Sequence, residues 1–285
     1  MENATKALLI VAGVMIGIMI LSLLVLGYNQ ISSYYASKDA DEAITQLAKF
    51  NETFENYNKS NIRGTDLLTL MNKIIDYNER YSYSNEKQYP RIKVNIEINT
   101  SGFTEIWKNN FMYSTTDSPI ITPNSRITNT TGGTNDKNRD KNLIAVTNIE
   151  NDLIRDNSDL NLNSTKLQKL TSNISNFRLG TNETDISITQ SQINDRLKRA
   201  NLIKDILGKT INFPNNNAGR AGIADSAGQT LISRVQTITT QYYQFTQFKR
   251  AYFKCTKVGY DTDTARINEM NFAIKLKADG TVEFN

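Results

Sequence analysis

The sequence contains no histidine, and that absence removes whole classes of chemistry. Histidine is the most common general base near neutral pH and the most common protein ligand of metal ions. With no histidine and one cysteine, zinc sites, Ser-His-Asp triads and Cys-His dyads are excluded. No Gly-rich phosphate-binding loop follows a predicted strand. We therefore expect a protein that is not an enzyme and holds no cofactor, with hydrolysis by paired carboxylates as the catalytic class left open.

Disulfide bonds and a strong excess of one charge are also missing. The single Cys255 rules out an intramolecular disulfide framework. Lys and Arg number 33 against 29 Asp and Glu, a net charge of +4 without the basic block that follows a phosphate backbone. We expect no nucleic-acid partner, and no motif indicates a small-molecule substrate.

What the chain does have is one long apolar run near its N-terminus. Residues 7–27 carry no charge, and Ser22 is the only polar side chain among them. A helix of this length covers the roughly 30 Å hydrocarbon core of a bilayer. The run is longer than the apolar part of a secretory signal and does not end in a small-x-small cleavage site. We expect a retained, single-pass signal anchor in the cell membrane, preceded by a short tail at residues 1–6.

The flanks and the small residues of the run suggest how it sits and what it contacts. Lys6 precedes the run, and this Lys/Arg bias favours the N-terminus inside and residues 28–285 outside the cytoplasm. Gly13 and Gly17 form a small-xxx-small motif, which lets two membrane helices approach closely. The bilayer is therefore an expected partner, and Gly13 and Gly17 mark a candidate assembly face.

A heptad pattern continues from the apolar run with no Pro or Gly between them. Its apolar residues alternate at spacings of 4 and 3, the repeat of a helix with one apolar stripe. We expect residues 28–60 to continue the membrane helix and to pack this stripe, called the seam below, on the C-terminal strands. The seam consists of Ala36, Ala40, Ala43, Leu47, Phe50, Phe54 and Tyr57.

The remaining residues predict both helices and strands. Residues 61–99 contain an amphipathic helix and then a strand in which Ile92, Val94 and Ile96 alternate with polar residues. Residues 246–285 alternate in the same way and contain Asp279-Gly280, a tight-turn signal. These patterns indicate two strand regions far apart in the chain.

The segment between those strand regions, residues 100–245, predicts a mostly helical insertion with a flexible loop near 114–141. The predicted fold class is therefore α+β. In it, a long N-terminal helix packs on a C-terminal antiparallel sheet, and the helical insertion lies between the first and later strands.

One weak metal candidate lies in the C-terminal region. Asp261 and Asp263 offer carboxylate oxygens of the kind that calcium prefers. The surrounding residues fail the helix-loop-helix calcium pattern, because Arg266 stands where that pattern needs Gly and Phe272 where it needs Glu. We expect a polar hairpin turn here and no metal site.

This arrangement resembles a type IV pilin or pseudopilin. The segments FNETFENYNKSNIRGTDLLTLMNKIIDYN and FKRAYFKCTKVGYD are also similar to those of single-span surface proteins of low-GC Gram-positive bacteria. The resemblance covers residues 1–98 and 246–285 and implies a structural or assembly subunit of a surface filament or secretion apparatus. It further implies self-association, or association with other single-span subunits.

A second hypothesis stays open from the sequence alone. The chain can instead be a signal-anchored extracytoplasmic binding domain, such as an adhesin, a sensor or a module of an envelope complex. In that case residues 100–245 carry recognition, although no motif among them names a ligand.

Overall fold

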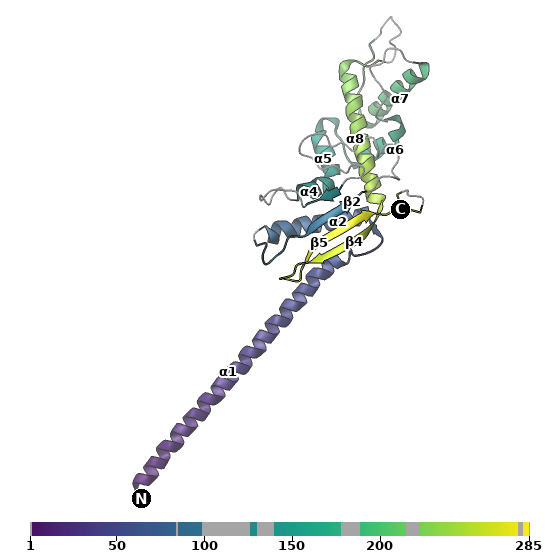
Figure 1. The fold of residues 1–285 in the computed structure, drawn as a ribbon. Coiled ribbons are helices and arrows are strands. Elements are labelled where there is room, and N and C mark those ends of the chain that lie inside the picture. The colour runs from purple at the N-terminus through teal and green to yellow at the C-terminus, as the bar shows by residue number, and fades with distance from the viewer. Residues whose placement is uncertain are drawn as a thin grey trace. The chain divides into compact units, whose positions relative to one another are not determined.

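The computed structural model describes residues 2–83, 85–98, 126–129, 140–177, 189–214, 223–278 and 282–284. The chain divides into two compact units, Met1–Thr53 and Phe54–Asn285. The first unit is helical, and the second holds a sheet and the other helices (Figure 1). The α+β fold class is confirmed.

Helix α1 (Glu2–Glu55) is continuous, as the apolar run and the seam predict. No proline interrupts it. Both predicted boundaries need correction, because the expected tail at residues 1–6 is helical from Glu2 and the helix ends before residue 60. The chain leaves the helix there to join the sheet, where the carbonyl of Lys59 accepts a hydrogen bond from the amide of Cys255 at 2.9 Å.

The sheet has five strands in the order β1-β4-β5-β2-β3. Strands β4 and β5 form an antiparallel hairpin, and β1 and β3 pair antiparallel at the two edges. The predicted all-antiparallel sheet is wrong at one place, because β2 runs parallel to β5. Parallel neighbours need a long crossover connection, which the helical insertion supplies. The strands are β1 (Ile62–Arg63), β2 (Lys93–Glu97), β3 (Arg126–Thr128), β4 (Tyr252–Tyr260) and β5 (Ile267–Ile274).

One face of the sheet is buried and the other is wet. Along β2, Val94 and Ile96 are buried while Lys93 and Glu97 are exposed, which confirms the predicted alternation. Along β5 the buried side chains are Ile267, Met270, Phe272 and Ile274. Asp279 and Gly280, the predicted turn, lie outside the described residues.

Helix α2 (Gly64–Tyr77) supplies the cover for the buried face. The amide of Gly64 donates to the carbonyl of Ala251, just before β4, at 2.9 Å. Asn78, which follows the helix, bonds the backbone of Ile92, just before β2. The helix therefore runs from the β4 side of the sheet to the β2 side. The side chains it buries completely are Leu67, Leu70, Met71 and Ile74.

Of the seam residues, the structure buries Phe54 at the start of the folded unit, and the packing of the earlier seam residues on the sheet stays a prediction. Ala36, Ala40 and Ala43 are exposed. Leu47, Phe50 and Tyr57 are half-buried, and Phe54 is buried. The periodicity correctly predicted a helix.

The insertion is helical as predicted, with two boundary corrections. Helix α8 extends to residue 250 and leads directly into β4, so the C-terminal strands begin at Tyr252 rather than at residue 246. Strand β3 lies inside the loop expected near 114–141, and most of that loop is outside the described residues. The helices are α4 (Lys141–Thr147), α5 (Ile149–Asp156), α6 (Ser164–Ser172), α7 (Gln190–Leu207) and α8 (Ser226–Arg250), with 3-10 turns η3 (Ser158–Leu160) and η4 (Ile174–Asn176).

Local sequence explains where the long helices of the insertion begin and end. Thr189 and Gln192 form a reciprocal capping box at the start of α7, and Gly208 ends that helix in a left-handed conformation, with φ 71°. The carboxylate of Asp225 accepts a hydrogen bond from the amide of Gly228 at 2.7 Å and so caps α8.

Gly64 lies at a close approach between α2 and α8 in the folded unit. A Cβ atom at this position would stand 1.8 Å from the carbonyl oxygen of Phe248, in the last turn of α8. A backbone oxygen cannot move aside as a flexible side chain can. Only glycine therefore allows α2 to begin against the end of α8.

We predict that Gly64→Ala destabilises the folded unit by about 3 kcal/mol or more, the upper range of overpacking substitutions. Urea unfolding of the full chain in detergent, followed by circular dichroism, measures the loss. The matched control is Gly13→Ala in α1, where an added Cβ meets nothing within 4 Å. An equal, small effect of both substitutions would show that the contact at Phe248 is not limiting.

Candidate functional site

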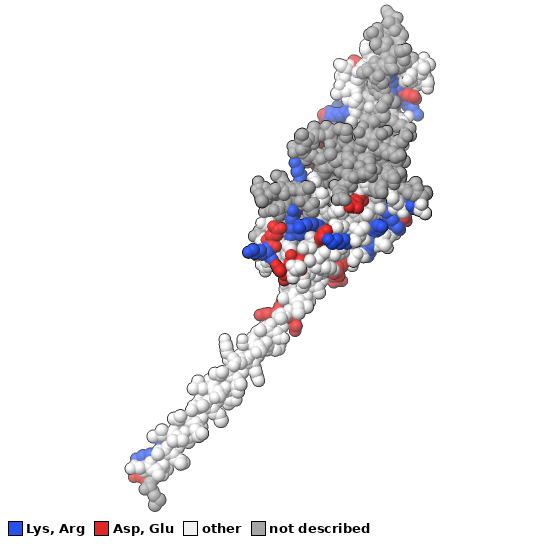
Figure 2. Space-filling model, in the orientation of Figure 1, with Lys and Arg blue, Asp and Glu red and all other residues white. Residues whose placement is uncertain are grey.

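The apolar surface of α1 is the first candidate site. Its large apolar side chains from Leu8 to Leu26 are each 52–74% exposed. Within the described residues, this is the one helix long and apolar enough to cross a membrane. Figure 2 shows that charged residues are confined to the ends of α1, leaving its middle uncharged. A surface of this kind requires lipid or other helices around it.

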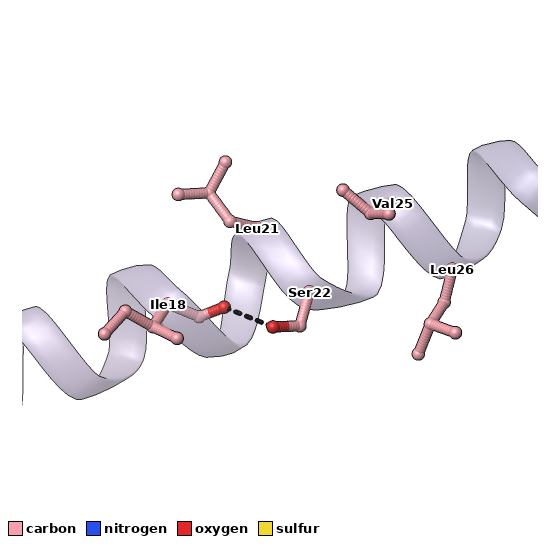
Figure 3. Close-up of a pocket in the computed structure, with 5 residues that line it drawn as sticks. All are labelled: Ile18, Leu21, Ser22, Val25 and Leu26. Atoms are coloured by element: carbon pink, nitrogen blue, oxygen red, sulfur yellow. Dashed lines mark hydrogen bonds between the residues drawn. The ribbon is translucent and has the colours of Figure 1, made fainter.

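Ser22, the polar residue of the apolar run, is satisfied within the helix. Its hydroxyl donates to the carbonyl of Ile18 at 2.8 Å (Figure 3). The shallow groove at this position is lined by side chains of α1 alone. Because the hydroxyl already has an acceptor, Ser22 adds little cost to burial of the helix in hydrocarbon. The lining residues are Ile18, Leu21, Ser22, Val25 and Leu26.

The predicted assembly residues Gly13 and Gly17 are open on the surface of α1. A Cβ added at either position would meet no atom within 4 Å. The 100° turn per residue places them on the face that carries Leu24 and, further along, Tyr28. The exposed seam residues, such as Ala40, lie on the opposite side, so one flat contact between two helices cannot use both sets.

The calcium candidates Asp261 and Asp263 belong to a hydrogen-bonded turn between β4 and β5. The Asp261 carboxylate accepts from the amide and the hydroxyl of Thr264, both at 2.9 Å, and from the amide of Asp263 at 3.2 Å. These donors, the Thr264 amide first, hold the pKa of Asp261 below its usual value. Across the described residues, no three acidic, histidine or cysteine side chains gather where they can hold a metal ion.

A buried carboxylate forms the second candidate site, which sequence reasoning missed. Asp140, at the start of α4, is 0% exposed. Its oxygens accept from the Asn129 side-chain amide at 2.6 Å, the Tyr83 hydroxyl at 2.6 Å and the Asn78 side-chain amide at 3.2 Å. The guanidinium of Arg91 lies 3.3 Å away and supplies the opposite charge. These five residues are called the Asp140 cluster below.

Backbone contacts determine how the two amides of the cluster are oriented. The Asn78 oxygen accepts from the amide of Ile92 at 3.0 Å, and the Asn129 oxygen accepts from the amide of Val94 at 2.8 Å. Both side-chain NH₂ groups also reach the Ile92 carbonyl, at 3.2 and 3.0 Å. With their oxygens used in this way, the asparagines present only donors to Asp140. The N–H groups of Asn78, Asn129 and Arg91 therefore surround the negative Asp140 carboxylate. A metal cation at this place would meet N–H donors as well as the carboxylate oxygens.

The cluster joins four chain segments that are distant in sequence. Asn78 opens a π-helical turn, η1 (Asn78–Ser82), Arg91 precedes β2, Asn129 follows β3 and Asp140 precedes α4. A single buried carboxylate therefore fixes the edge of the sheet to the first helix of the insertion. One sequence signal was available, a polar stretch around Asp140, but it predicts a loop equally well.

Burial also perturbs two tyrosines near this region. Burial raises the pKa of Tyr77 to about 12. Burial first, and then donation of its hydroxyl hydrogen bond to Asp140, raises the pKa of Tyr83 as well. Both hydroxyls therefore stay protonated in the folded chain at a pH where exposed tyrosines ionise.

The solvent-exposed face of the sheet carries charge pairs. Lys257 on β4 lies 2.6 Å from the Glu269 carboxylate on β5, and Asn271 donates to the same carboxylate at 2.9 Å. The hydrogen bond from Lys257 is the main reason that the pKa of Glu269 is lowered. These contacts lie on an open surface and stabilise the hairpin modestly.

Comparison with known proteins adds no relative to these observations: no protein-family model, curated protein or solved structure matches the chain. Its function is therefore inferred from the residues and their geometry.

We predict that Asp140→Asn destabilises the folded unit by about 3–5 kcal/mol, because it leaves Arg91 buried without an opposite charge. The same substitution at Asp159 is the control. Asp159 also pairs with an arginine, Arg234, but on the surface, so its loss should change the urea midpoint little. Equal midpoints for the two variants would mean that the Asp140 cluster does not hold the fold.

We also predict that the free energy of unfolding decreases as the pH rises from 10 to about 12. In this window tyrosines of the unfolded chain ionise, while Tyr77 and Tyr83 in the folded chain stay protonated. The folded state then binds more protons than the unfolded state, so alkali favours unfolding. Unfolding midpoints measured across this range should fall less steeply for Tyr77→Phe than for the parent chain. An unchanged slope in that variant would contradict the assignment.

Proposed function

We propose that this chain is a membrane-anchored, pilin-like structural or assembly subunit of a surface filament or secretion apparatus. The observation that carries the proposal is the continuity of α1, which passes unbroken from its apolar run into the folded unit. The folded unit would then lie outside the cytoplasm.

Energetics support two environments for the apolar half of α1. Each large apolar side chain gains about 1.5–3 kcal/mol when it leaves water. Lipid provides that gain for a single chain, and the packed helices of other copies provide it in an assembly. A protein that exchanges one environment for the other has the physical behaviour that the resemblance to pilins implies.

The seam supports contact between copies beyond the membrane. Ala36, Ala40 and Ala43 are exposed and small, so another helix can approach their backbone closely. Anchoring in one membrane orients all copies in the same direction, which favours parallel contacts. The buried core of the folded unit contains none of these residues.

Cysteine cross-linking of the full chain in membranes tests the assembly proposal. In a Cys255→Ser background, Ala40→Cys places a thiol on the seam, and Thr45→Cys places one about 140° around the helix. We expect oxidation to give covalent dimers or larger species with Ala40→Cys and much less with Thr45→Cys.

Other results would contradict this proposal in recognisable ways. If neither variant cross-links and the protein extracts as a dispersed monomer, the assembly function is wrong and a signal-anchored binding domain is favoured. If the protein is released from membranes by alkaline carbonate, the membrane anchor itself is wrong.

A further inference from the structure

The uncharged part of α1 is longer than the apolar run that it contains. From Ala7 to Ser37, 31 residues carry no charge, and Lys6 and Lys38 flank them. At 1.5 Å per residue this length is about 46 Å. That distance exceeds the roughly 30 Å hydrocarbon core and is close to the ~40–45 Å of a bilayer with its headgroup layers. The ten residues after Gly27 therefore have the length of a headgroup crossing.

Aromatic residues are concentrated in this extension. Before Phe50, the only aromatic residues of α1 are Tyr28, Tyr34 and Tyr35. Their side chains are 73%, 65% and 59% exposed. A tyrosine has an apolar ring and a polar hydroxyl, and such side chains are enriched where hydrocarbon meets water.

The extension has an aromatic face and a polar face. Tyr28, Ile31 and Tyr35 follow at spacings of 3 and 4 and share one face of the helix. On the other side, the hydroxyl of Ser33 donates to the carbonyl of Asn29 at 2.8 Å. That hydroxyl needs no water partner, so this turn of the helix can enter a partly dehydrated layer.

The charged residues after Ser37 indicate where α1 leaves the lipid headgroup layer. Lys38 comes one turn after Tyr35, within reach of lipid phosphates for a long cationic side chain. Asp39, Asp41 and Glu42 come next, and carboxylates are repelled by anionic lipid phosphates. The order of tyrosines, lysine and acids matches a path from the hydrocarbon boundary to water.

We propose that Tyr28, Ile31, Tyr34, Tyr35 and Lys38 form an interfacial collar that lies in the phospholipid headgroup layer and sets the depth of α1 in the bilayer. The proposal rests on the membrane anchoring proposed above. It assigns the aromatic face of the extension, which continues the Gly13 and Gly17 side of α1, to lipid, and leaves the side that carries Ala40 available to other copies.

Tryptophan fluorescence of the full chain in phospholipid vesicles tests the collar. The chain has a single tryptophan, Trp107, so Trp107→Phe provides a silent background. Met19→Trp, Tyr35→Trp and Ile44→Trp then report on the middle of the span, the collar and the helix beyond it. Vesicles of phosphatidylcholine and phosphatidylglycerol carry either bromines within the acyl chains or a nitroxide on the headgroup.

We expect a graded pattern of quenching. The Met19→Trp variant loses most fluorescence to the brominated acyl chains, and the Tyr35→Trp variant to the headgroup nitroxide. The Ile44→Trp variant loses fluorescence mainly to aqueous acrylamide. The emission maximum should shift to longer wavelength in the same order.

Each failure is distinguishable. If the Tyr35→Trp variant behaves like the Ile44→Trp variant while the Met19→Trp variant stays deep, the collar is wrong and the anchor remains. If the Met19→Trp variant escapes both lipid quenchers, the anchoring fails. If the Tyr35→Trp variant is shielded from every quencher until the protein is diluted in lipid, a second copy covers the face and the collar is again wrong.

Discussion

A buried negative charge has to be fully paired, and in the folded unit that requirement is met at Asp140. Donors from a π-helical turn, from the start of β2 and from the end of β3 meet at one carboxylate that opens α4. Removing a charge from water costs several kcal/mol, so each donor has to be in place before the cluster becomes favourable. The sheet and the insertion are consequently joined as one cooperative unit. The same cluster bonds the backbone of Ile92, just before Lys93 begins the pairing of β2 with β5.

Helix α1 differs from the folded unit, because its apolar side chains are exposed. The folded unit pairs its buried Asp140 carboxylate internally, whereas the large apolar side chains of α1 from Leu8 to Leu26 are exposed. Its helical backbone bonds are all made within the helix, which is the condition for entering lipid. The apolar run of α1 has the length and composition of a helix that can enter lipid. The packing of the first unit therefore depends on the lipid or protein around it, whereas the second unit has its own buried core.

Local periodicity predicted the long N-terminal helix, the helical insertion and the alternation of β2, but not strand β3, which lies in the expected loop. The uncharged run predicted the span of α1, and the alternation around Val94 predicted which face of β2 is buried. The parallel pairing of β2 with β5 and the Asp140 cluster depend on residues far apart in the chain, which no local pattern reports. The seam shows both what a local pattern predicts and what it cannot predict. Its spacing predicted a helix, but an apolar stripe does not indicate which element covers it. In the structure, α2 covers the buried face of the sheet.

The connection between the two units is helical. From Tyr28 to Arg63 there is no glycine or proline, and the helix continues to Glu55. Its last turn is held by packing of Phe54 and by a hydrogen bond of 2.7 Å from Tyr260 to Glu55. A tethered binding domain gains reach from a flexible linker, and this chain has a helix in that position instead.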